Sequence, residues 1–403
     1  MRTASGLNID SLLEAIQHVV GPSSKANPIS LHEPDFSGTK AWDYVRDCLD
    51  TGWVSTAGTW VSRFEEKLCS ITGAKHAVVV SNGTVALRLS LHLVGVAHGD
   101  EVLLPPLSFV ATANAVVHLG AEPHFVDVEP NSLGICPVAL DSRLKAIAEL
   151  RDGMLFNRET GRRIAAVLPV HVFGHPAEVS QLRTVADKWG IPLVEDAAEA
   201  LASRRNQIHC GLFGSVGILS FNGNKLITTG GGGALITNDS VLANRARHLS
   251  TTAKKPHAWQ FDHDAVAWND RLPNINAALG VAQLEDLDRR LHAKRQLAQR
   301  YAAAIADLEG VELVAEPTDC RSNHWLVSLR LTAADPLHAS SQRLRLLKAA
   351  HELGLLLRPI WLPLHQLPMY RHSPTGPLMV ADDQAHRLLN LPSSPQLLKG
   401  FVL

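Results

Sequence analysis

Short apolar runs alternate with helical stretches along the first 240 residues of the chain. The runs that predict strands lie at 102–104, 125–126, 164–170 and 191–194. Alternation of this kind predicts an α/β fold with a mainly parallel sheet. From 281 to 308 the pattern predicts one long charged helix, and the residues after it predict the strands and helices of a smaller C-terminal α/β domain.

The N-terminal residues predict a separate helix. Residues 9–20 carry apolar side chains at helical spacing, after Asn8 or Asp10 as a cap and before Gly21 and Pro22. We expect this helix to dock on the body of the protein, with 21–27 as its linker. The expected division is therefore an N-terminal extension and linker (1–30), a large domain (31–280) and a smaller C-terminal domain (281–403).

Lys225 stands between two apolar runs, 217–221 and 234–237, and is followed by four consecutive glycines at 230–233. The runs predict short buried strands, so the lysine would lie in a poorly hydrated pocket. Desolvation disfavours an ammonium ion and leaves more free amine. Such an amine forms Schiff bases with carbonyl compounds, including pyridoxal 5'-phosphate (PLP). The alternative is a surface lysine at the tip of a hairpin.

The apolar run at 191–194 leads directly into Glu195 and Asp196 and then into a turn of small residues. This order places a carboxylate at the C-terminal end of a parallel strand, where ligands of open α/β sheets bind. Asp196 could pair there with the protonated pyridine nitrogen that makes a PLP ring an electron sink. The alternative is that Asp196 caps a helix.

A candidate phosphate site precedes both residues in the chain. Residues 77–80 predict a buried strand, 81–84 a turn of small residues and 85–91 a helix. The backbone N–H groups and the dipole at such a helix N-terminus bind anions. Neither this segment nor the Lys225 loop contains GxGxxG or GxxxxGK[ST], which argues against a dinucleotide or a nucleoside triphosphate.

In this order and spacing, the motifs resemble the DegT/DnrJ/EryC1/StrS sugar aminotransferases, which are PLP enzymes of fold type I. The resemblance extends from about Ile29 to about Pro392 and is carried by residues 58–65, 81–87, 108–116, 195–200, the Lys225 loop and 276–280. Further segments resemble the LegC-type subgroup, namely 50–55, 221–225, 251–254, 358–361 and 390–394. That subgroup aminates nucleotide-linked 4-keto-6-deoxy sugars on routes to legionaminic acid or bacillosamine.

The resemblance implies a role for each matching residue. Lys225 would form the Schiff base with PLP, and Asp196 would pair with the pyridine nitrogen. The other cofactor-binding positions that it implies are Gly83, Thr84 and Ser220 at the phosphate, Phe109 on the ring face, and Glu199 near the ring, where many relatives carry Gln or His. Phe109 could equally be a core residue.

Asn269 and Arg271 match an Asn-Tyr-Arg element that, in the family, reaches the cofactor phosphate of the neighbouring subunit, although Asp270 replaces the tyrosine. The resemblance therefore implies a homodimer with shared active sites. An arginine suits a phosphate dianion because its guanidinium donates charge-assisted hydrogen bonds. In the alternative, Asn269 is a turn residue and Arg271 pairs with Asp262 or Asp264.

The expected reaction is a transamination in which a donor, by resemblance glutamate, gives its amino group to PLP and the half-reaction then reverses on a nucleotide-linked keto sugar. Candidate sugar contacts are Trp53, Thr56, Arg358, His365 and Tyr370.

Two other functions remain open. A dehydratase of this fold would carry histidine in place of Lys225, and a non-catalytic PLP-binding regulator would not need Lys225 and Asp196 together.

The composition of the chain argues against several classes of partner and site. A formal net charge of −1 gives no electrostatic case for nucleic acid or an anionic membrane, and no apolar run suggests a signal peptide or a transmembrane helix. Five scattered cysteines without a CxxC pair indicate reduced thiols in a cytoplasmic protein. We expect no metal site, because His171 and His175 flank a loop without a further ligand. His171 would lie near the cofactor or satisfy a loop hydrogen bond.

Overall fold

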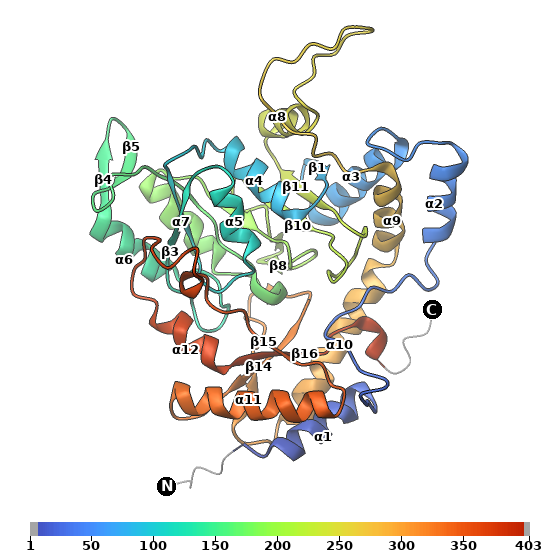
Figure 1. Cartoon of the computed structure of the whole chain (residues 1–403), viewed down its shortest axis with the longest axis vertical. Coiled ribbons are helices and arrows are strands. Elements are labelled where there is room, and N and C mark those ends of the chain that lie inside the picture. Colours follow the sequence, from blue (N-terminus) through green and yellow to red (C-terminus); the bar gives the residue numbers. More distant parts are fainter. Residues whose placement is uncertain (1–6, 399–403) are drawn as a thin grey trace.

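The computed structural model describes residues 7–398, and a mixed sheet forms the centre of its larger part (Figure 1). The strand order is β1 (His76–Val80), β11 (Gly233–Thr237), β10 (Val216–Ser220), β7 (Val194–Asp196), β6 (Ile164–Val167), β2 (Glu101–Leu104) and β3 (Glu122–Phe125). Isolated parallel bridges, including Val170 to Asp196, join β6 and the residues after it to β7. From β10 to β3 the pairing is parallel, whereas β11 is antiparallel to both of its neighbours.

Both faces of this sheet are buried. Successive side chains of a strand point to opposite faces, so one strand contributes to two cores. In β1, Val78 and Val80 join the core formed with α4 (Gly83–Leu93), α5 (Ala111–Val117) and α8 (Ser240–Ser250). Ala77 and Val79 instead join the core formed with α3 (Thr59–Thr72) and α9 (Asn274–Glu285). A further core packs α6 (Pro137–Ile147) and α7 (Val179–Trp189) on β2 and β6. This two-sided burial explains why the strands are unbroken apolar runs in the sequence.

A smaller antiparallel sheet lies in the lower half of Figure 1, in the order β12 (Val311–Leu313), β14 (Val327–Leu331), β16 (Leu388–Leu391) and β15 (Arg358–Pro359). It shares one core with α10 (Leu287–Ile305), α11 (Pro336–Glu352) and α1 (Ile9–Val20). The expected N-terminal helix is therefore present, with Asn8 accepting a hydrogen bond from the backbone N–H of Ser11 as its cap. Its apolar stripe, which includes Leu12 and Ile16, docks it on α10 and α11.

The remaining elements are short. They are α2 (Ala41–Asp50), the hairpin β4 (Ala148–Arg151) and β5 (Met154–Asn157), a small sheet of β13 (Cys320–Arg321), β8 (Arg204–Arg205) and β9 (Ile208–His209), α12 (Met379–Arg387), and the 3-10 turns η1 (Val172–Gly174), η2 (Leu364–Gln366) and η3 (Pro395–Leu397). Among the described residues, no helix combines the length and the apolar character needed to cross a bilayer.

The single long helix expected over 281–308 is wrong. α9 ends at Glu285 and α10 begins at Leu287, because Asp286 leaves helical geometry at φ −105° and ψ 7°. Its carboxylate accepts a hydrogen bond from Nε of Arg289 (2.6 Å) and lies 3.1 Å from Nε of Arg290. These charged contacts stabilise the N-terminus of α10. The apolar spacing continues across the break, so periodicity alone does not reveal it.

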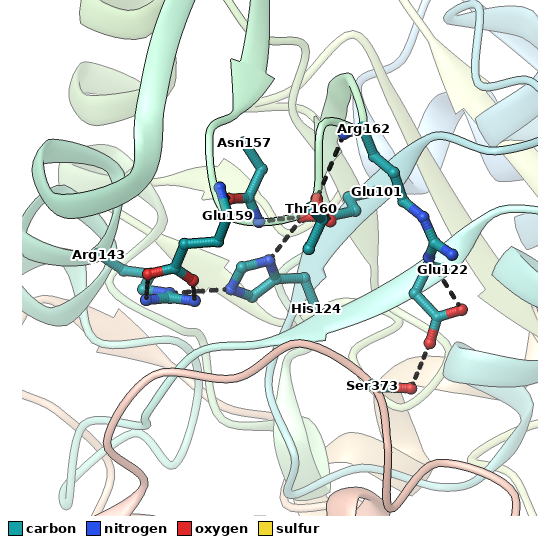
Figure 2. A network of polar contacts seen from close by, with 9 residues as sticks. All are labelled: Glu101, Glu122, His124, Arg143, Asn157, Glu159, Thr160, Arg162 and Ser373. Carbon is teal, nitrogen blue, oxygen red and sulfur yellow. Dashed lines mark hydrogen bonds and ion pairs between the residues drawn. The ribbon is translucent and has the colours of Figure 1, made fainter.

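A buried polar network ties the β4–β5 hairpin and the loop after it to β2 and β3 (Figure 2). Glu101, the first residue of β2, accepts hydrogen bonds from His124 (2.8 Å), Asn157 (2.9 Å) and Thr160 (2.5 Å). Nε2 of His124 accepts from Arg143, so its Nδ1 carries the proton given to Glu101. Burial alone would raise the pKa of Glu101, but these hydrogen bonds lower it below its usual value. The network lies at the N-terminal end of β2, whereas Asp196 lies at the C-terminal end of β7, so the two are at opposite edges of the parallel strands.

Candidate active site

A cavity of about 380 Å³ opens where β7 and β10 end. Because these strands are parallel, their C-terminal residues Asp196 and Ser220 reach the same edge of the sheet. The expected site residues that line the cavity are Gly83, Thr84, Phe109, Asp196, Glu199, Ser220 and Lys225. The fold thus brings together segments that are more than 100 residues apart in the chain.

Lys225 lies in the loop between β10 and β11, the two strands expected around it. Its side chain is only 13% exposed, so the alternative of a surface lysine is wrong. Nζ lies 3.4 Å from Oε1 of Glu199 and 4.0 Å from the ring centroid of Trp325. Gly232 allows the loop to close, because a Cβ there would lie 2.2 Å from Oγ1 of Thr229. The loop therefore directs the amine into the cavity.

Asp196 presents a buried carboxylate to the same cavity. Oδ2 accepts a hydrogen bond from the hydroxyl of Thr112 (2.8 Å), and Oδ1 accepts from the backbone N–H of Ala198 (3.1 Å). Burial raises the pKa of Asp196, and these two hydrogen bonds oppose the rise. The alternative of a helix cap is wrong, because residues 197–202 form turns and no helix.

The neighbouring Glu195 points to the other face of β7, as alternation along a strand requires. Its buried carboxylate accepts hydrogen bonds from Nε2 of His171 and from the backbone N–H groups of Gly211, Phe213 and Gly214. Nδ1 of His171 accepts from the backbone N–H of Ala177. Of the two roles expected for His171, the structure shows the loop hydrogen bond, and His171 does not line the cavity.

The small-residue turn before α4 has the form of an anion site. Asn82 caps the helix by accepting from the N–H of Val85 (2.9 Å), whereas within the described residues the N–H groups of Gly83 and Thr84 donate no hydrogen bond. Both residues line the cavity beside Ser220. A Cβ on Gly83 would lie 3.0 Å from Cβ of Ser220, so the glycine keeps the turn and the end of β10 together.

Aromatic side chains form the other side of the cavity. Phe109 is 54% exposed and lines it, so the alternative of a core residue is wrong. Its ring centroid lies 6.5 Å from that of Trp361, which stacks on Phe173 at 5.1 Å. Phe173 has a positive φ of 57°, and its backbone N–H donates to Oε2 of Glu199 (2.8 Å). Burial raises the pKa of Glu199, and the neighbouring Lys225 opposes the rise.

Asn269 and Arg271 do not line the cavity of their own chain. Asn269 is exposed, and Nη1 of Arg271 donates to Oε1 of Glu65 (2.9 Å). The expected alternative for Arg271, a pair with Asp262 or Asp264, is therefore wrong. 

Asp270, which replaces the tyrosine of the family element, forms an ion pair with Arg88 of α4. The guanidinium of Arg88 also lies over the ring of Trp268, 4.5 Å from its centroid. Burial raises the pKa of Asp270, whereas Arg88 lowers it. The negative charge at this position is therefore paired and does not face a phosphate alone.

Among the expected sugar contacts, Arg358 lines the cavity, and Trp53, Thr56, His365 and Tyr370 do not. His365 instead lies 3.2 Å from Asp382, and Tyr370 is buried with its hydroxyl bonded to Asn114. In the part of the chain that the structure describes, no group of three His, Cys, Asp or Glu side chains could hold a metal ion.

Sequence analysis missed several residues that shape the site. Thr112, in α5, falls within the 108–116 segment, and its hydroxyl lies 2.7 Å from that of Ser108 in the bend before the helix. Trp361 falls within the 358–361 segment but was assigned no role. Trp325 carries no local signal, because it reaches Lys225 only through tertiary packing.

The sequence profile of the DegT/DnrJ/EryC1/StrS aminotransferase family matches residues 37–402. The chain belongs to this family. EpsN of Bacillus subtilis (strain 168), which is named as a pyridoxal phosphate-dependent aminotransferase, is 36% identical over 92% of each chain. The GDP-perosamine synthase of Vibrio cholerae is 34% identical over 92% of this chain and 95% of its own. The crystal structure of the aminotransferase TlmJ from Streptoalloteichus hindustanus has a TM-score of 0.80 at 29% identity, covering 91% of this chain and 93% of TlmJ.

As a member of this family, the protein is a PLP-dependent aminotransferase of fold type I. The groups around the cavity fit that cofactor on their own chemistry. Lys225 supplies a primary amine and Asp196 a buried carboxylate. Gly83 and Thr84 supply free N–H groups beside the hydroxyl of Ser220, and Phe109 supplies an exposed aromatic face. A PLP enzyme needs an amine, an acid for the ring nitrogen and an anion site.

Proposed function

We propose that this enzyme aminates a nucleotide-linked 4-keto-6-deoxy sugar at C4, with L-glutamate as the amino donor, on a route to legionaminic acid or a bacillosamine-type sugar. The observation that carries the proposal is that Lys225 and Asp196 line one cavity together with the anion-binding turn at Gly83 and Thr84. Support for the substrate class comes from the Vibrio cholerae relative, whose name gives a product linked to GDP. Support for the subgroup comes from the LegC-type segments, including the one that contains Arg358.

In this proposal, Lys225 holds the cofactor covalently until the amino donor displaces it. Its Nζ would then move a proton from Cα of the donor to C4' of the cofactor, first as general base and then as general acid, and the same transfer would run in reverse when the keto sugar is aminated. PLP, when bound, supplies an electron sink. Asp196 would accept a hydrogen bond from the N–H of the cofactor ring, and Thr112 and the backbone N–H of Ala198 hold its carboxylate in one orientation.

The phosphate of the cofactor is bound, in our proposal, by the N–H groups of Gly83 and Thr84 and by Ser220. The cationic side chains that line the cavity, within the described chain, are Lys225 and Arg358. Lys225 is engaged with Glu199, and Arg358 is the candidate contact for the sugar, so in this proposal the anion site lacks a positive charge of its own. We infer that Arg271 of a second copy supplies this charge and that Asn269 of that copy adds a neutral hydrogen bond.

The segment before Asn269 supports such a dimer. It leaves α8 as a long loop that projects from the body in Figure 1, bridged at Lys254 and His263. Trp259, Phe261 and Val266 on this loop are 77%, 73% and 95% exposed. Apolar side chains gathered on a projecting segment are typical of an interaction surface, and a second copy would cover them while receiving Asn269.

Assays with a panel of UDP-, GDP- and dTDP-linked 4-keto-6-deoxy sugars test the proposal. We expect L-glutamate and one class of sugar to give 2-oxoglutarate and a sugar nucleotide in which an amine replaces the ketone, detected by mass spectrometry. Lys225→Ala is the matched control, because it removes the reactive amine. Loss of a sugar hydroxyl without gain of nitrogen would indicate a dehydratase instead. Absence of any turnover, with PLP bound, would favour a regulator.

A further inference from the structure

Trp325 belongs to the loop that precedes β14, in the smaller part of the protein, yet its ring lines the cavity beside Lys225. Its side chain is buried, and Nε1 donates a hydrogen bond to the carbonyl oxygen of Asn224 (2.7 Å). The face of the same ring lies 4.0 Å from Nζ of Lys225. One indole therefore contacts both the backbone directly before the lysine and the amine at its tip.

The position of this indole is itself fixed. The backbone N–H of Trp325 donates to Oδ1 of Asn323 (2.8 Å), and its carbonyl accepts from Nζ of the buried Lys294 (3.0 Å). Asn323 in turn donates to the carbonyl oxygens of Glu199 and Leu201 (both 2.9 Å). The loop is thus tied to the backbone of the turn that follows Asp196, and this fixes the backbone from which the indole extends.

Core packing alone does not account for this arrangement. A buried indole N–H needs an acceptor, and many carbonyls would serve. Here the acceptor is the residue before Lys225, and the ring face is turned to the ammonium in the geometry of a cation–π contact. Lys225 has a long flexible stem, so fixing both ends of it restricts where the amine can point.

We propose that Trp325 is a positioning residue that holds Lys225 for its attachment to the cofactor. The proposal rests on the function proposed for Lys225 above. In the attachment, the neutral amine forms a bond to the aldehyde carbon of the cofactor and the aldehyde oxygen leaves as water. Trp325 makes and breaks no bond, and its contribution is to present Nζ in one orientation while Glu199 faces it from the other side.

The test compares Trp325→Phe, which keeps a ring and removes the N–H donor, with Trp325→Leu, which removes both contacts. Trp189→Phe is the matched control, because Nε1 of Trp189 also makes one hydrogen bond, to Asp141 (2.9 Å), and Trp189 does not line the cavity. Each cofactor-free protein is mixed with PLP, and borohydride stops the reaction at set times. Mass spectrometry of the peptide that contains Lys225 then measures the fraction of lysine carrying the cofactor.

We expect attachment to Lys225 to be about tenfold slower in Trp325→Phe, from loss of one buried hydrogen bond, and about a hundredfold slower in Trp325→Leu, because the ring face that limits where Nζ can point is lost as well. The visible circular dichroism of the bound cofactor should also change in both, because it depends on the orientation of the chromophore. Trp189→Phe should match the wild type in both measurements.

The outcomes separate this inference from the proposed function. If the wild type carries no cofactor on Lys225, the proposed role of Lys225 is wrong and the inference falls with it. If the wild type is labelled at Lys225 and both Trp325 variants match Trp189→Phe in rate and in circular dichroism, only the inference is wrong. Should Trp325→Leu not fold, judged by thermal unfolding, Trp325→Phe alone decides, because it keeps an aromatic ring in the core and removes less volume.

Discussion

Nζ of Lys225 lies 3.4 Å from Oε1 of Glu199, within a cavity where both side chains are largely removed from water. Each charge depends on the other, because a buried ion that loses its partner keeps its desolvation cost. Burial already raises the pKa of Glu199, and Lys225 opposes that rise.

Lys225→Ala should therefore fold but be less stable without cofactor. We expect a loss of about 1–3 kcal/mol near pH 7 from the unpaired carboxylate. The sign follows from the raised pKa of Glu199, since such a group contributes stability below its ordinary pKa that is lost as pH rises through the folded value. Thermal unfolding at pH 5 and pH 8 should show a larger deficit at pH 8.

Adding Glu199→Gln to Lys225→Ala tests the same pair by removing the charge that the first substitution leaves unpaired. The amide can still accept from the N–H of Phe173 but carries no charge, so the double variant should regain much of the lost stability and its dependence on pH. A Lys225→Ala protein whose unfolding temperature responds neither to pH nor to the second substitution would contradict the coupling.

The Lys225→Ala protein should not retain PLP after borohydride treatment, whereas a Lys254→Ala control should retain it.

Asp196→Asn should retain PLP but turn over slowly. The groups proposed for the phosphate, at Gly83 and Thr84, lie on another element, so binding should persist. We expect kcat to fall at least about a hundredfold, because a neutral amide no longer stabilises positive charge on the ring nitrogen. Thr112→Val provides the comparison: it removes one donor to Asp196 and should cost about tenfold. A nearly unchanged kcat in Asp196→Asn would contradict the assignment.

Glu101→Gln should destabilise the fold without touching the cavity. The amide N–H₂ would replace one carboxylate oxygen, and would face either the donors of His124 and Asn157 at Oε2 or the hydroxyl of Thr160 at Oε1 (Figure 2), so we expect a loss of about 2–4 kcal/mol. Glu159→Gln is the matched control, because Glu159 is half exposed and its pair with Arg143 should contribute under about 1 kcal/mol.

The pH dependence of unfolding gives a second readout for Glu101. Its pKa is depressed in the folded protein, so its stabilisation is present above the ordinary carboxyl pKa of 4.5 and is lost as pH falls through the lower folded value. Between pH 6 and pH 3 the unfolding temperature of Glu101→Gln should fall less steeply than that of Glu159→Gln. Parallel curves would show that the hydrogen bonds of Glu101 do not stabilise its charged form.

Mixed dimers test the shared site. Lys225→Ala and Asn269→Ala/Arg271→Ala should each be nearly inactive, whereas exchange of subunits should restore activity in one of the two sites of each mixed dimer. Because Arg271 pairs with Glu65 in its own chain, Glu65→Gln serves as a control for loss of that ion pair, together with the pair between Glu65 and Arg247. An active monomer in sedimentation, or inactivity after demonstrated exchange, would show that the site is not shared.

Much of the fold and of the candidate site could be predicted because the signals are local. The strand, turn and helix that contain Gly83, and the two strands around Lys225, are each encoded within about twenty residues by apolar runs and glycines. The break at Asp286 escaped prediction, because it interrupts the backbone without disturbing the apolar spacing. The partner of Arg271 escaped it as well, since Glu65 is 206 residues away.

The sequence by itself predicted that Asp196 stands at the C-terminal end of a parallel strand and that Lys225 lies between two buried strands, because apolar runs and residue order are properties of the chain. Only the tertiary structure decided what surrounds them. Thr112 contacts Asp196 across 84 residues of sequence, and Glu199 contacts Lys225 across 26. Trp325 contacts Asn224, the residue before Lys225, across 101. These contacts orient the two groups. Such contacts depend on how helices and loops pack after the chain has collapsed, and no periodicity within one segment records that packing.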